Sequence, residues 1–370
     1  MSISEVPITR TLRYVVAFVT IWVAGAGAAE SVFRTLGDRP SADLEGLYVP
    51  FGDGNYTLRA SIDTSATWST GRFTVHTDQL GLRCDLNRKM AARPGDSVDV
   101  LFLGDSQGFG NGVNYEDTIA GTFARLAAAD GYVVRNACVG GQSPLNQLDL
   151  ARTLAQDEQV HVRTYIYLFT PVAVAQCNGF TRVTVGQDGR LYDEGGSNSM
   201  TLLRTWMKTH LAIYSRFRDA VRASGVGVTA DADTPFVVQV YDTSAEAANA
   251  TTCVEFLSKF KQFAAQHGAA VQVVYVPLTI EMSFDSVRRA GDRRGIVVNS
   301  DVPFRTLAAA AQKVDIPLYD LRPVLRDFNS RGQALSLLPD FHYTGPVSRA
   351  SGNKVWQEYS ARVRARRTES

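Results

Sequence analysis

The residues best suited to chemistry are a serine and a histidine that lie far apart in the sequence. Ser106 stands within Gly-Asp-Ser-Gln-Gly at 104–108, directly after an apolar run at 98–103 that is typical of a buried parallel strand. A serine placed where such a strand breaks into glycines can expose its hydroxyl at the carboxyl edge of a sheet. His342, with Asp340 two positions before it, offers the base that a serine hydroxyl needs to become a nucleophile.

Three sequence blocks in the chain resemble motifs of the SGNH, or GDSL-type, esterases and acyltransferases. The first is Gly-Asp-Ser at 104–106, the second is Asn-Ala-Cys-Val-Gly-Gly-Gln-Ser at 136–143, and the last is Leu-Pro-Asp-Phe-His-Tyr-Thr-Gly at 338–345. The resemblance implies that Ser106 is the nucleophile and that the backbone N–H groups of Ser106 and Gly141 hold the developing oxyanion. It also implies that His342 is the base and that Asp340 orients it.

The sequence departs from the family pattern in two places. The family's third block ends a central strand with an asparagine that donates to the oxyanion, whereas here the apolar run at 164–169 leads into Thr170. Thr170 and Asn178 are the nearby side chains that could donate instead. Losing one such donor typically costs on the order of 2.7–4 kcal/mol of transition-state stabilisation.

The second departure concerns the acidic partner of His342. The usual spacing is Asp-x-x-His, but Asp340 precedes His342 by two positions, as in some relatives that act on surface polysaccharides. Asp320 and Asp327 are the alternatives. Asp105 is similar to a family residue that supports the nucleophile turn through hydrogen bonds.

Other chemistry-bearing residues fit structural roles better. The glycines at 108–112 lack the Gly-x-Gly-x-x-Gly spacing of a dinucleotide loop, and Asn136 stands where an acidic ribose partner would be expected. The four cysteines have no metal-ligand spacing, so no metal site is expected, and both disulfides and buried free thiols remain open. Cys138 is interpreted as a small loop residue. The remaining histidines are expected at surface or packing positions: His76, His161, His210 and His267.

Composition limits the class of protein. The 370 residues are 45% hydrophobic, enough for a sizeable core in one large or two ordinary domains, and the formal net charge is +1. The absence of a long basic run argues against an extended nucleic-acid surface. The arginines at 362–367 are interpreted as a solvated helix end. No organic cofactor is expected.

The N-terminus indicates export. Arg10 and Arg13 precede an uncharged segment at 14–29, which is short for a spanning helix and predicts a cytoplasmic N-terminus. We expect residues 1–37 to form an uncleaved signal anchor that leaves the rest outside the cytoplasm, periplasmic or extracellular. Cleavage at the small residues 27–29, giving a secreted protein, is the alternative. A buried helix of a cytosolic protein is a third reading.

The remaining chain predicts an α/β domain at 96–370 after a β-rich prelude and connector at 38–95. Strands and helices alternate, which indicates a three-layer α/β/α fold with a central parallel sheet of the flavodoxin-like SGNH type. Short alternating runs at 56–84 predict the prelude, and 78–83 resembles an element that precedes the first core strand in exported relatives. A hairpin is expected within an insertion near 178–200. We expect strands at 98–103, 132–136, 164–169, 270–277 and 316–319, and helices at 118–129, 146–156, 201–223, 245–267, 304–313 and 353–366.

These features together predict a membrane-tethered serine ester hydrolase. The expected reaction proceeds through an acyl-enzyme on Ser106, with acyl esters as substrates and O-acetyl groups of an envelope glycan as the favoured class. With water as acceptor the protein is an esterase or deacetylase, and with a sugar hydroxyl it is an O-acyltransferase. The alternative from another class is a non-catalytic glycan-binding or scaffolding protein, which the missing asparagine favours.

Overall fold

The computed structural model describes most of the chain beyond residue 45. The described residues are 20, 24–32, 46–52, 54–68, 71–87, 92–179, 181, 183–186, 189, 191–193, 235–336 and 341–369. Residues Asp43–Gly196 and Thr229–Ser370 form one compact unit, which holds the main sheet. Of the expected anchor, the structure describes Thr20 and a helical stretch at 24–32. No helix among the described residues has both the length and the apolar character needed to cross a membrane.

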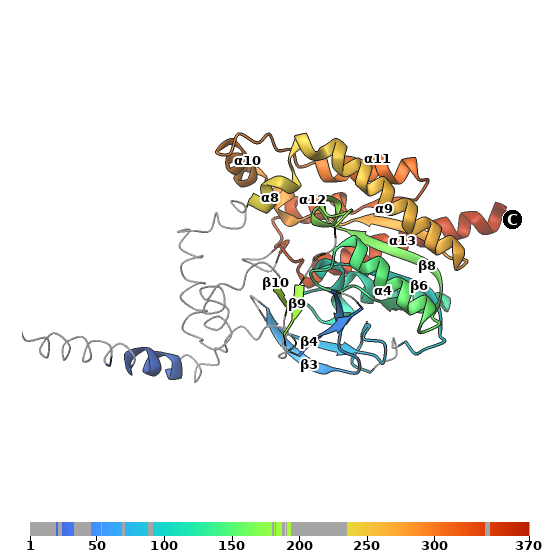
Figure 1. Cartoon of the computed structure of the whole chain (residues 1–370), viewed down its shortest axis with the longest axis horizontal. Coiled ribbons are helices and arrows are strands. Elements are labelled where there is room, and N and C mark those ends of the chain that lie inside the picture. The colour runs from blue at the N-terminus through green and yellow to red at the C-terminus, as the bar shows by residue number, and fades with distance from the viewer. Residues whose placement is uncertain are drawn as a thin grey trace, which may run out of the picture. The chain divides into compact units, whose positions relative to one another are not determined.

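An eight-stranded mixed sheet forms the centre of this unit (Figure 1). Five neighbouring strands are parallel and three more extend the sheet in antiparallel fashion. The expected central parallel sheet is therefore confirmed. In spatial order the strands are β12 (Leu318–Asp320), β11 (Ala270–Tyr275), β8 (His161–Phe169), β6 (Ser97–Gly104), β7 (Val134–Asn136), β5 (Arg83–Cys84), β4 (Gly71–Thr77) and β3 (Asp63–Trp68).

The strand order places the end of β6 at a switch point. The chain passes from β6 to β7 on one side and then crosses to β8 on the other, which is the doubly wound order in which ligands bind outside the carboxyl ends of the strands. Gly104 at the end of β6 is level with Leu168 of β8, and Phe169 is level with Tyr275 of β11. Residues that follow these strands therefore gather at one edge.

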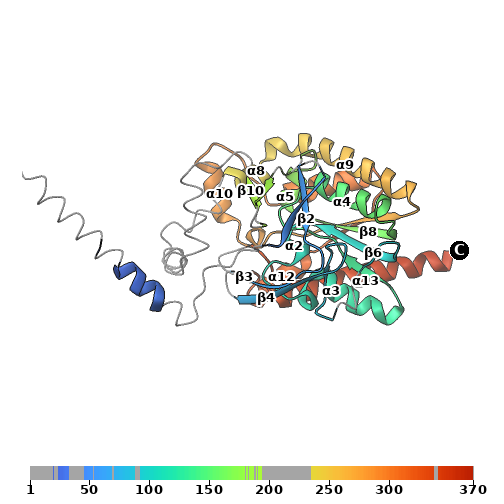
Figure 2. The ribbon, with the colours of Figure 1, turned by 60° about the horizontal axis from the view of Figure 1, so that its bottom comes forward.

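Helices cover both faces of the sheet (Figure 2). Helices α3 (Ile119–Ala127) and α13 (Gly345–Glu369) lie on one face, and α4 (Pro144–Gln156), α9 (Glu246–Gln266) and α11 (Val302–Lys313) lie on the other. A Cβ on Gly352 would lie 2.6 Å from the Ile119 carbonyl oxygen, so glycine is needed for α13 to approach α3 this closely. The fully buried apolar residues of β6 and β8 form the centre of the core between these layers.

Short helices complete the unit near the ends of the strands. Two of them, α2 and α5, directly follow β6 and β8. The short helices are α2 (Ser106–Phe109), α5 (Pro171–Ala175), α8 (Pro235–Val240), α10 (Asp285–Asp292) and α12 (Arg322–Ser330), with 3-10 turns at Tyr115–Asp117, Ala128–Asp130, Thr243–Ala245 and Thr279–Met282.

The predicted β-rich prelude is present, and its strands divide between two sheets. Strands β1 (Tyr48–Phe51) and β2 (Asn55–Leu58) form a separate antiparallel hairpin. Strands β3 to β5 join the main sheet through β7, where Arg83 pairs with Asn136. The prelude therefore shares hydrogen bonds with the α/β core.

Most of the expected elements are observed within a few residues of their predicted bounds. The hairpin expected in the insertion is formed by β9 (Val183–Val185) and β10 (Leu191–Asp193). The final helix begins earlier than expected, at Gly345. The helix expected at 201–223 and much of the insertion near 178–200 lie outside the described residues.

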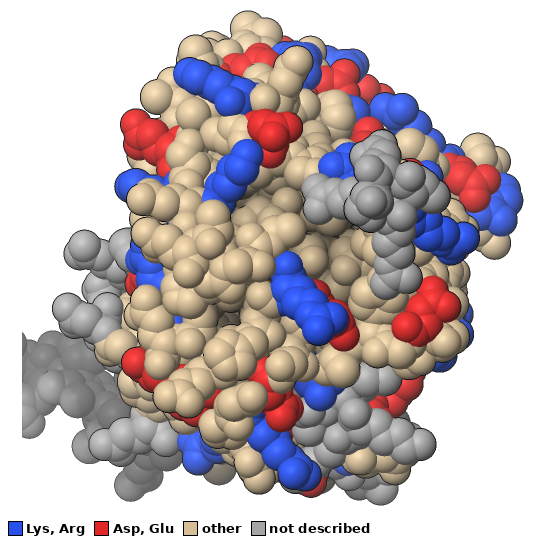
Figure 3. All heavy atoms as spheres, turned by 90° about the vertical axis from the view of Figure 1, so that its right-hand side faces the viewer, with Lys and Arg blue, Asp and Glu red and all other residues tan. Residues whose placement is uncertain are grey.

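Charged side chains of both signs alternate on the face seen in Figure 3. On the described residues of this face, blue Lys and Arg side chains stand among red Asp and Glu side chains. This mixture agrees with the net charge of +1.

Candidate active site

Ser106 lies on a tight turn at the carboxyl end of β6. The strand ends at Gly104, Asp105 caps the next helix, and Ser106 is the first residue of α2. The Gln107 N–H donates to Oδ1 of Asp105 at 3.0 Å, which fixes the cap. Ser106 is half-buried, so its side chain stands at the edge of the sheet and not in its core.

Glycines allow this turn to pack tightly against the neighbouring loop. A Cβ on Gly108 would lie 2.5 Å from Sγ of Cys138, and one on Gly104 would lie 3.0 Å from Cβ of Leu168. Burial raises the pKa of the Cys138 thiol well above its ordinary value. A thiol held protonated in this way is a poor nucleophile, which agrees with the interpretation of Cys138 as a packing residue.

His342 lies beside the same turn. Its Nε2 is 3.5 Å from Nδ2 of Asn111, and the Asn111 N–H donates to the Ser106 carbonyl oxygen at 3.2 Å. Asn111 is 5% exposed, and its Oδ1 has no hydrogen-bond partner among the described residues. Ser106 and His342, which are more than 230 positions apart in the sequence, therefore both contact Asn111.

The acidic partner predicted for His342 lies outside the described residues, because these resume at Phe341. Both alternatives have other partners. Asp320 accepts from Nη2 of Arg322 at 2.9 Å, and Asp327 forms an exposed ion pair with Arg331. Asp340 therefore remains the predicted partner.

Asp105 lies close enough to His342 to respond to its charge. Burial raises the pKa of the Asp105 carboxyl, whereas the hydrogen bond from Thr170 and the charge of His342 lower it. Oγ1 of Thr170 donates to Oδ2 of Asp105 at 2.5 Å. The Asp105 carboxyl group therefore links the turn at Ser106 to the end of β8.

The second sequence block packs against Ser106. A Cβ on Gly140 would lie 3.7 Å from Cβ of Ser106 and 3.1 Å from Oη of Tyr48, so the loop passes directly over the serine. Gly141 follows with φ +79°, a left-handed conformation that favours glycine. The N–H groups of Ser106, Gly140 and Gly141 donate to no other described residue.

The prelude hairpin holds this loop in place. Oη of Tyr56 donates to the Gly140 carbonyl oxygen at 3.1 Å, and the rings of Tyr48 and Tyr56 meet edge to face with centroids 5.7 Å apart. The prelude thus takes part in building the site, a role that its short alternating strands did not predict.

Neither proposed substitute for the third-block asparagine is placed to donate. Thr170 directs its hydroxyl hydrogen to Asp105 and caps α5 by accepting from the Ala173 N–H at 3.3 Å. Asn178 is exposed beyond α5. The side-chain carboxamide found beside Ser106 and His342 is instead that of Asn111.

Comparisons with known proteins find solved structures that resemble the fold of this chain, but they do not assign the chain to a family. No family model matches the chain, and no curated protein matches it. The chain is similar to the psychrotrophic esterase EstA from Pseudoalteromonas sp., with 10% identity over 73% of this chain and 99% of that one at a TM-score of 0.38. It is also similar to a lipase/acylhydrolase from Enterococcus faecalis, with 12% identity over 72% and 97% of the two chains at a TM-score of 0.38.

A third similar structure is a variant of Axe2, an acetyl xylan esterase from Geobacillus stearothermophilus. It is 10% identical over 72% of this chain and 95% of that one, again at a TM-score of 0.38. Similarity at this level does not define an activity. The functional assignment therefore rests on the geometry of the site.

Arg83 supports the nucleophile turn from the prelude side. Its fully buried guanidinium donates to the carbonyl oxygens of Phe109, Gly110 and Val113, and it stacks 4.4 Å from the ring centroid of Phe109. Burial lowers its pKa to about 10, so it stays charged at neutral pH. The sequence predicted a structural role for the segment at 78–83, but it did not predict the hydrogen-bond partners of Arg83.

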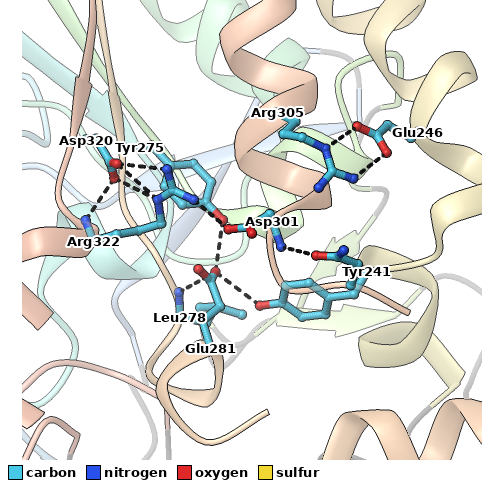
Figure 4. Close-up of polar contacts among 10 residues, drawn as sticks. Tyr241, Glu246, Tyr275, Leu278, Glu281, Asp301, Arg305, Asp320 and Arg322 are labelled. Atoms are coloured by element: carbon cyan, nitrogen blue, oxygen red, sulfur yellow. Dashed lines mark hydrogen bonds and ion pairs between the residues drawn. The ribbon is translucent and has the colours of Figure 1, made fainter. Parts of the chain in front are cut away.

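A second polar cluster lies at the ends of β11 and β12 (Figure 4). The carboxyl group of Glu281 accepts from Oη of Tyr275 at 2.9 Å, from Oη of Tyr241 at 3.3 Å and from the Leu278 N–H at 3.1 Å. Burial raises its pKa from 4.5 to about 8, against the lowering effect of these bonds and of Arg322. Nothing in the sequence around Glu281 signalled this environment.

The described residues offer no site for a metal. No group of three or more His, Cys, Asp or Glu side chains among them is arranged to hold an ion.

Proposed function

We propose that the chain is a serine-dependent ester hydrolase of the SGNH type. The observation that supports the proposal is that Ser106, at the carboxyl end of β6, and His342 both lie beside Asn111, with Gly140 packed against Ser106. Acyl transfer requires a nucleophile, a base and oxyanion donors close together. The likeness in sequence motifs adds to this geometry.

The proposed reaction has two half-reactions. His342 takes the proton of the Ser106 hydroxyl as its oxygen attacks the ester carbonyl, and the N–H groups of Ser106 and Gly141 hold the oxyanion. The tetrahedral intermediate expels the alcohol, which receives the proton from His342, and an acyl-Ser106 ester remains. Water, deprotonated by His342, then releases the carboxylic acid and restores Ser106. Asp340 is proposed to orient the imidazole and stabilise its charged form.

The acceptor and the substrate extend this proposal. A sugar hydroxyl in place of water would make the protein an O-acyltransferase with the same acyl-enzyme. Acetyl esters of an envelope glycan are the proposed substrate class, with residues 1–37 as the anchor. The disulfide between Cys177 and Cys253 supports export, because disulfides persist in oxidising compartments.

Hydrolysis of p-nitrophenyl acetate by the full chain tests the proposal. We expect turnover that Ser106→Ala abolishes and that Ser258→Ala, an exposed serine on α9, leaves unchanged. Added sugar alcohols would divert the acetyl group if the acceptor is a hydroxyl. Activity that survives Ser106→Ala would refute the proposed nucleophile. No turnover by correctly folded protein would favour a non-catalytic glycan-binding or scaffolding role.

A further inference from the structure

The side chain of Gln107 bonds to the backbone on both sides of His342. Its Nε2 donates to the Phe341 carbonyl oxygen at 2.8 Å, and its Oε1 accepts from the Tyr343 N–H at 3.3 Å. Gln107 is only 5% exposed, so water competes little for these bonds. One carboxamide therefore spans the residue proposed as the base.

We infer that Gln107 is a positioning residue that fixes His342 relative to Ser106. We call the two hydrogen bonds of the Gln107 side chain the clamp. Gln107 directly follows Ser106 in α2, so the clamp connects the segment around His342 to the residue next to the proposed nucleophile. The alternative path along the chain runs through more than 230 residues. General-base catalysis depends on hydrogen-bond distance between the two groups, and a displacement of about 1 Å can cost on the order of 100-fold in rate.

Asn111 on the same turn adds a contact to the histidine ring. Its Nδ2 lies 3.5 Å from Nε2, the ring nitrogen that faces the turn. One carboxamide therefore bonds to the residues on both sides of His342 and a second contacts its ring, and both stand within five residues of Ser106. The inference depends on the proposed function only in the test that measures the reactivity of Ser106.

Other anchors hold the segment when Gln107 is changed. Oη of Tyr343 donates to the Pro277 carbonyl oxygen, and Tyr343 forms a β-bridge with Ser336. The Thr344 N–H donates to the Leu335 carbonyl oxygen at 3.1 Å. Replacement of Gln107 should therefore loosen His342 locally without unfolding the segment.

The first test measures the rate at which a fluorophosphonate labels Ser106 in the full chain. Gln107→Leu keeps the size of the side chain and removes both bonds, and we expect labelling to slow by on the order of tenfold to 100-fold. In Gln107→Glu the introduced carboxyl can replace both bonds only when it is protonated. Its rate relative to wild type should therefore rise as the pH falls toward 5.

A second test does not depend on activity. Hydrogen exchange of peptides covering residues 341–350 should become faster in Gln107→Leu, because the Tyr343 N–H loses its acceptor, while peptides from α9 should not change. Unchanged exchange at 341–350, or Gln107 variants that label at the wild-type rate at every pH, would overturn the inference. If wild type is not labelled, the proposed function fails, and the exchange result still decides whether the clamp exists.

Discussion

At the scale of single residues, Thr170 takes a role different from that of the asparagine it stands in for. Its hydroxyl donates to the Asp105 carboxyl group and accepts from the Ala173 N–H. Ser106 and Oδ1 of Asn111 both lie close to Gly140. Polar groups are therefore present around Ser106 even though Thr170 is engaged elsewhere.

Thr170→Val should destabilise the protein by about 1–3 kcal/mol. The change removes the 2.5 Å hydrogen bond to Asp105 and leaves a buried carboxyl without one of its donors. Urea unfolding monitored by fluorescence measures the effect. Thr170→Ser, which keeps the hydroxyl, is the matched control and should lie close to wild type. Equal stability of the Val and wild-type proteins would contradict this role.

The sequence predicted that Ser106 follows a core strand and that Asp105 supports its turn, but it did not predict the contacts of Gln107 and Asn111. Ser106 could be placed because an apolar strand and glycines flank it, which is a local pattern. The contacts of Gln107 and Asn111 with the segment around His342 span more than 230 residues and follow only from the folded topology. Asp340 remains a prediction.

At the scale of elements, β5 joins the prelude to the core, and the sequence did not predict this strand because it is very short. Strand β5 has two residues and meets β7 at a single pair, too few for an alternating pattern to be seen. The core strands β6 and β8, by contrast, are long apolar runs and were predicted. Strand β5 places Arg83 beside the carbonyl groups of the turn that follows Ser106.

Arg83→Met should cost on the order of 3 kcal/mol or more of unfolding free energy. It keeps the length of the side chain but removes the guanidinium's hydrogen bonds to carbonyl oxygens of Thr74, Gly110 and Val113, and a buried oxygen left without a donor costs about 1–3 kcal/mol. Arg163→Met is the control, since Arg163 is 79% exposed and its ion pair with Asp99 should contribute about 1 kcal/mol at most. Similar losses in the two variants would contradict the proposed bracing of the turn.

The Glu281 cluster at the ends of β11 and β12 should make stability depend on pH. The native carboxyl stays protonated up to about pH 8, whereas in the unfolded chain it ionises near 4.5. Between these values the native state holds one proton more, so the free energy of unfolding falls as the pH rises and this contribution is complete only below about 4.5.

Thermal unfolding of Glu281→Gln tests this dependence. The variant keeps a hydrogen-bonding side chain without a titrating group, so its melting temperature should decline less than that of wild type between pH 5 and 8. Glu246→Gln is the control, because the ion pair with Arg305 lowers the pKa of Glu246 and gives no slope in this range. Parallel pH profiles for wild type and Glu281→Gln would refute the assignment.

At the scale of the whole molecule, one covalent link joins segments far apart in the sequence. Cys177 after α5 and Cys253 on α9 are 76 positions apart and form a disulfide. The cysteine spacing alone left this pairing open, because the two residues meet only through the packing of α5 against α9. Cys84 and Cys138 are buried and do not take part in the disulfide.

Removing this disulfide should lower the free energy of unfolding by on the order of 4 kcal/mol, the loop-entropy value for a closure of this length. The Cys177→Ala, Cys253→Ala double variant leaves no new thiol, and denaturant unfolding measures the loss. Dithiothreitol should destabilise wild type and leave the double variant unaffected. A wild-type protein indifferent to reductant would contradict the link.

The most direct test of the central claim is to treat the full chain with a fluorophosphonate and locate the adduct by peptide mapping. An activated serine predicts one adduct, on Ser106, that is absent from Ser106→Ala and strongly reduced in His342→Ala. An adduct on another residue, or none on natively folded protein, would contradict the claim that Ser106 and His342 form a catalytic pair.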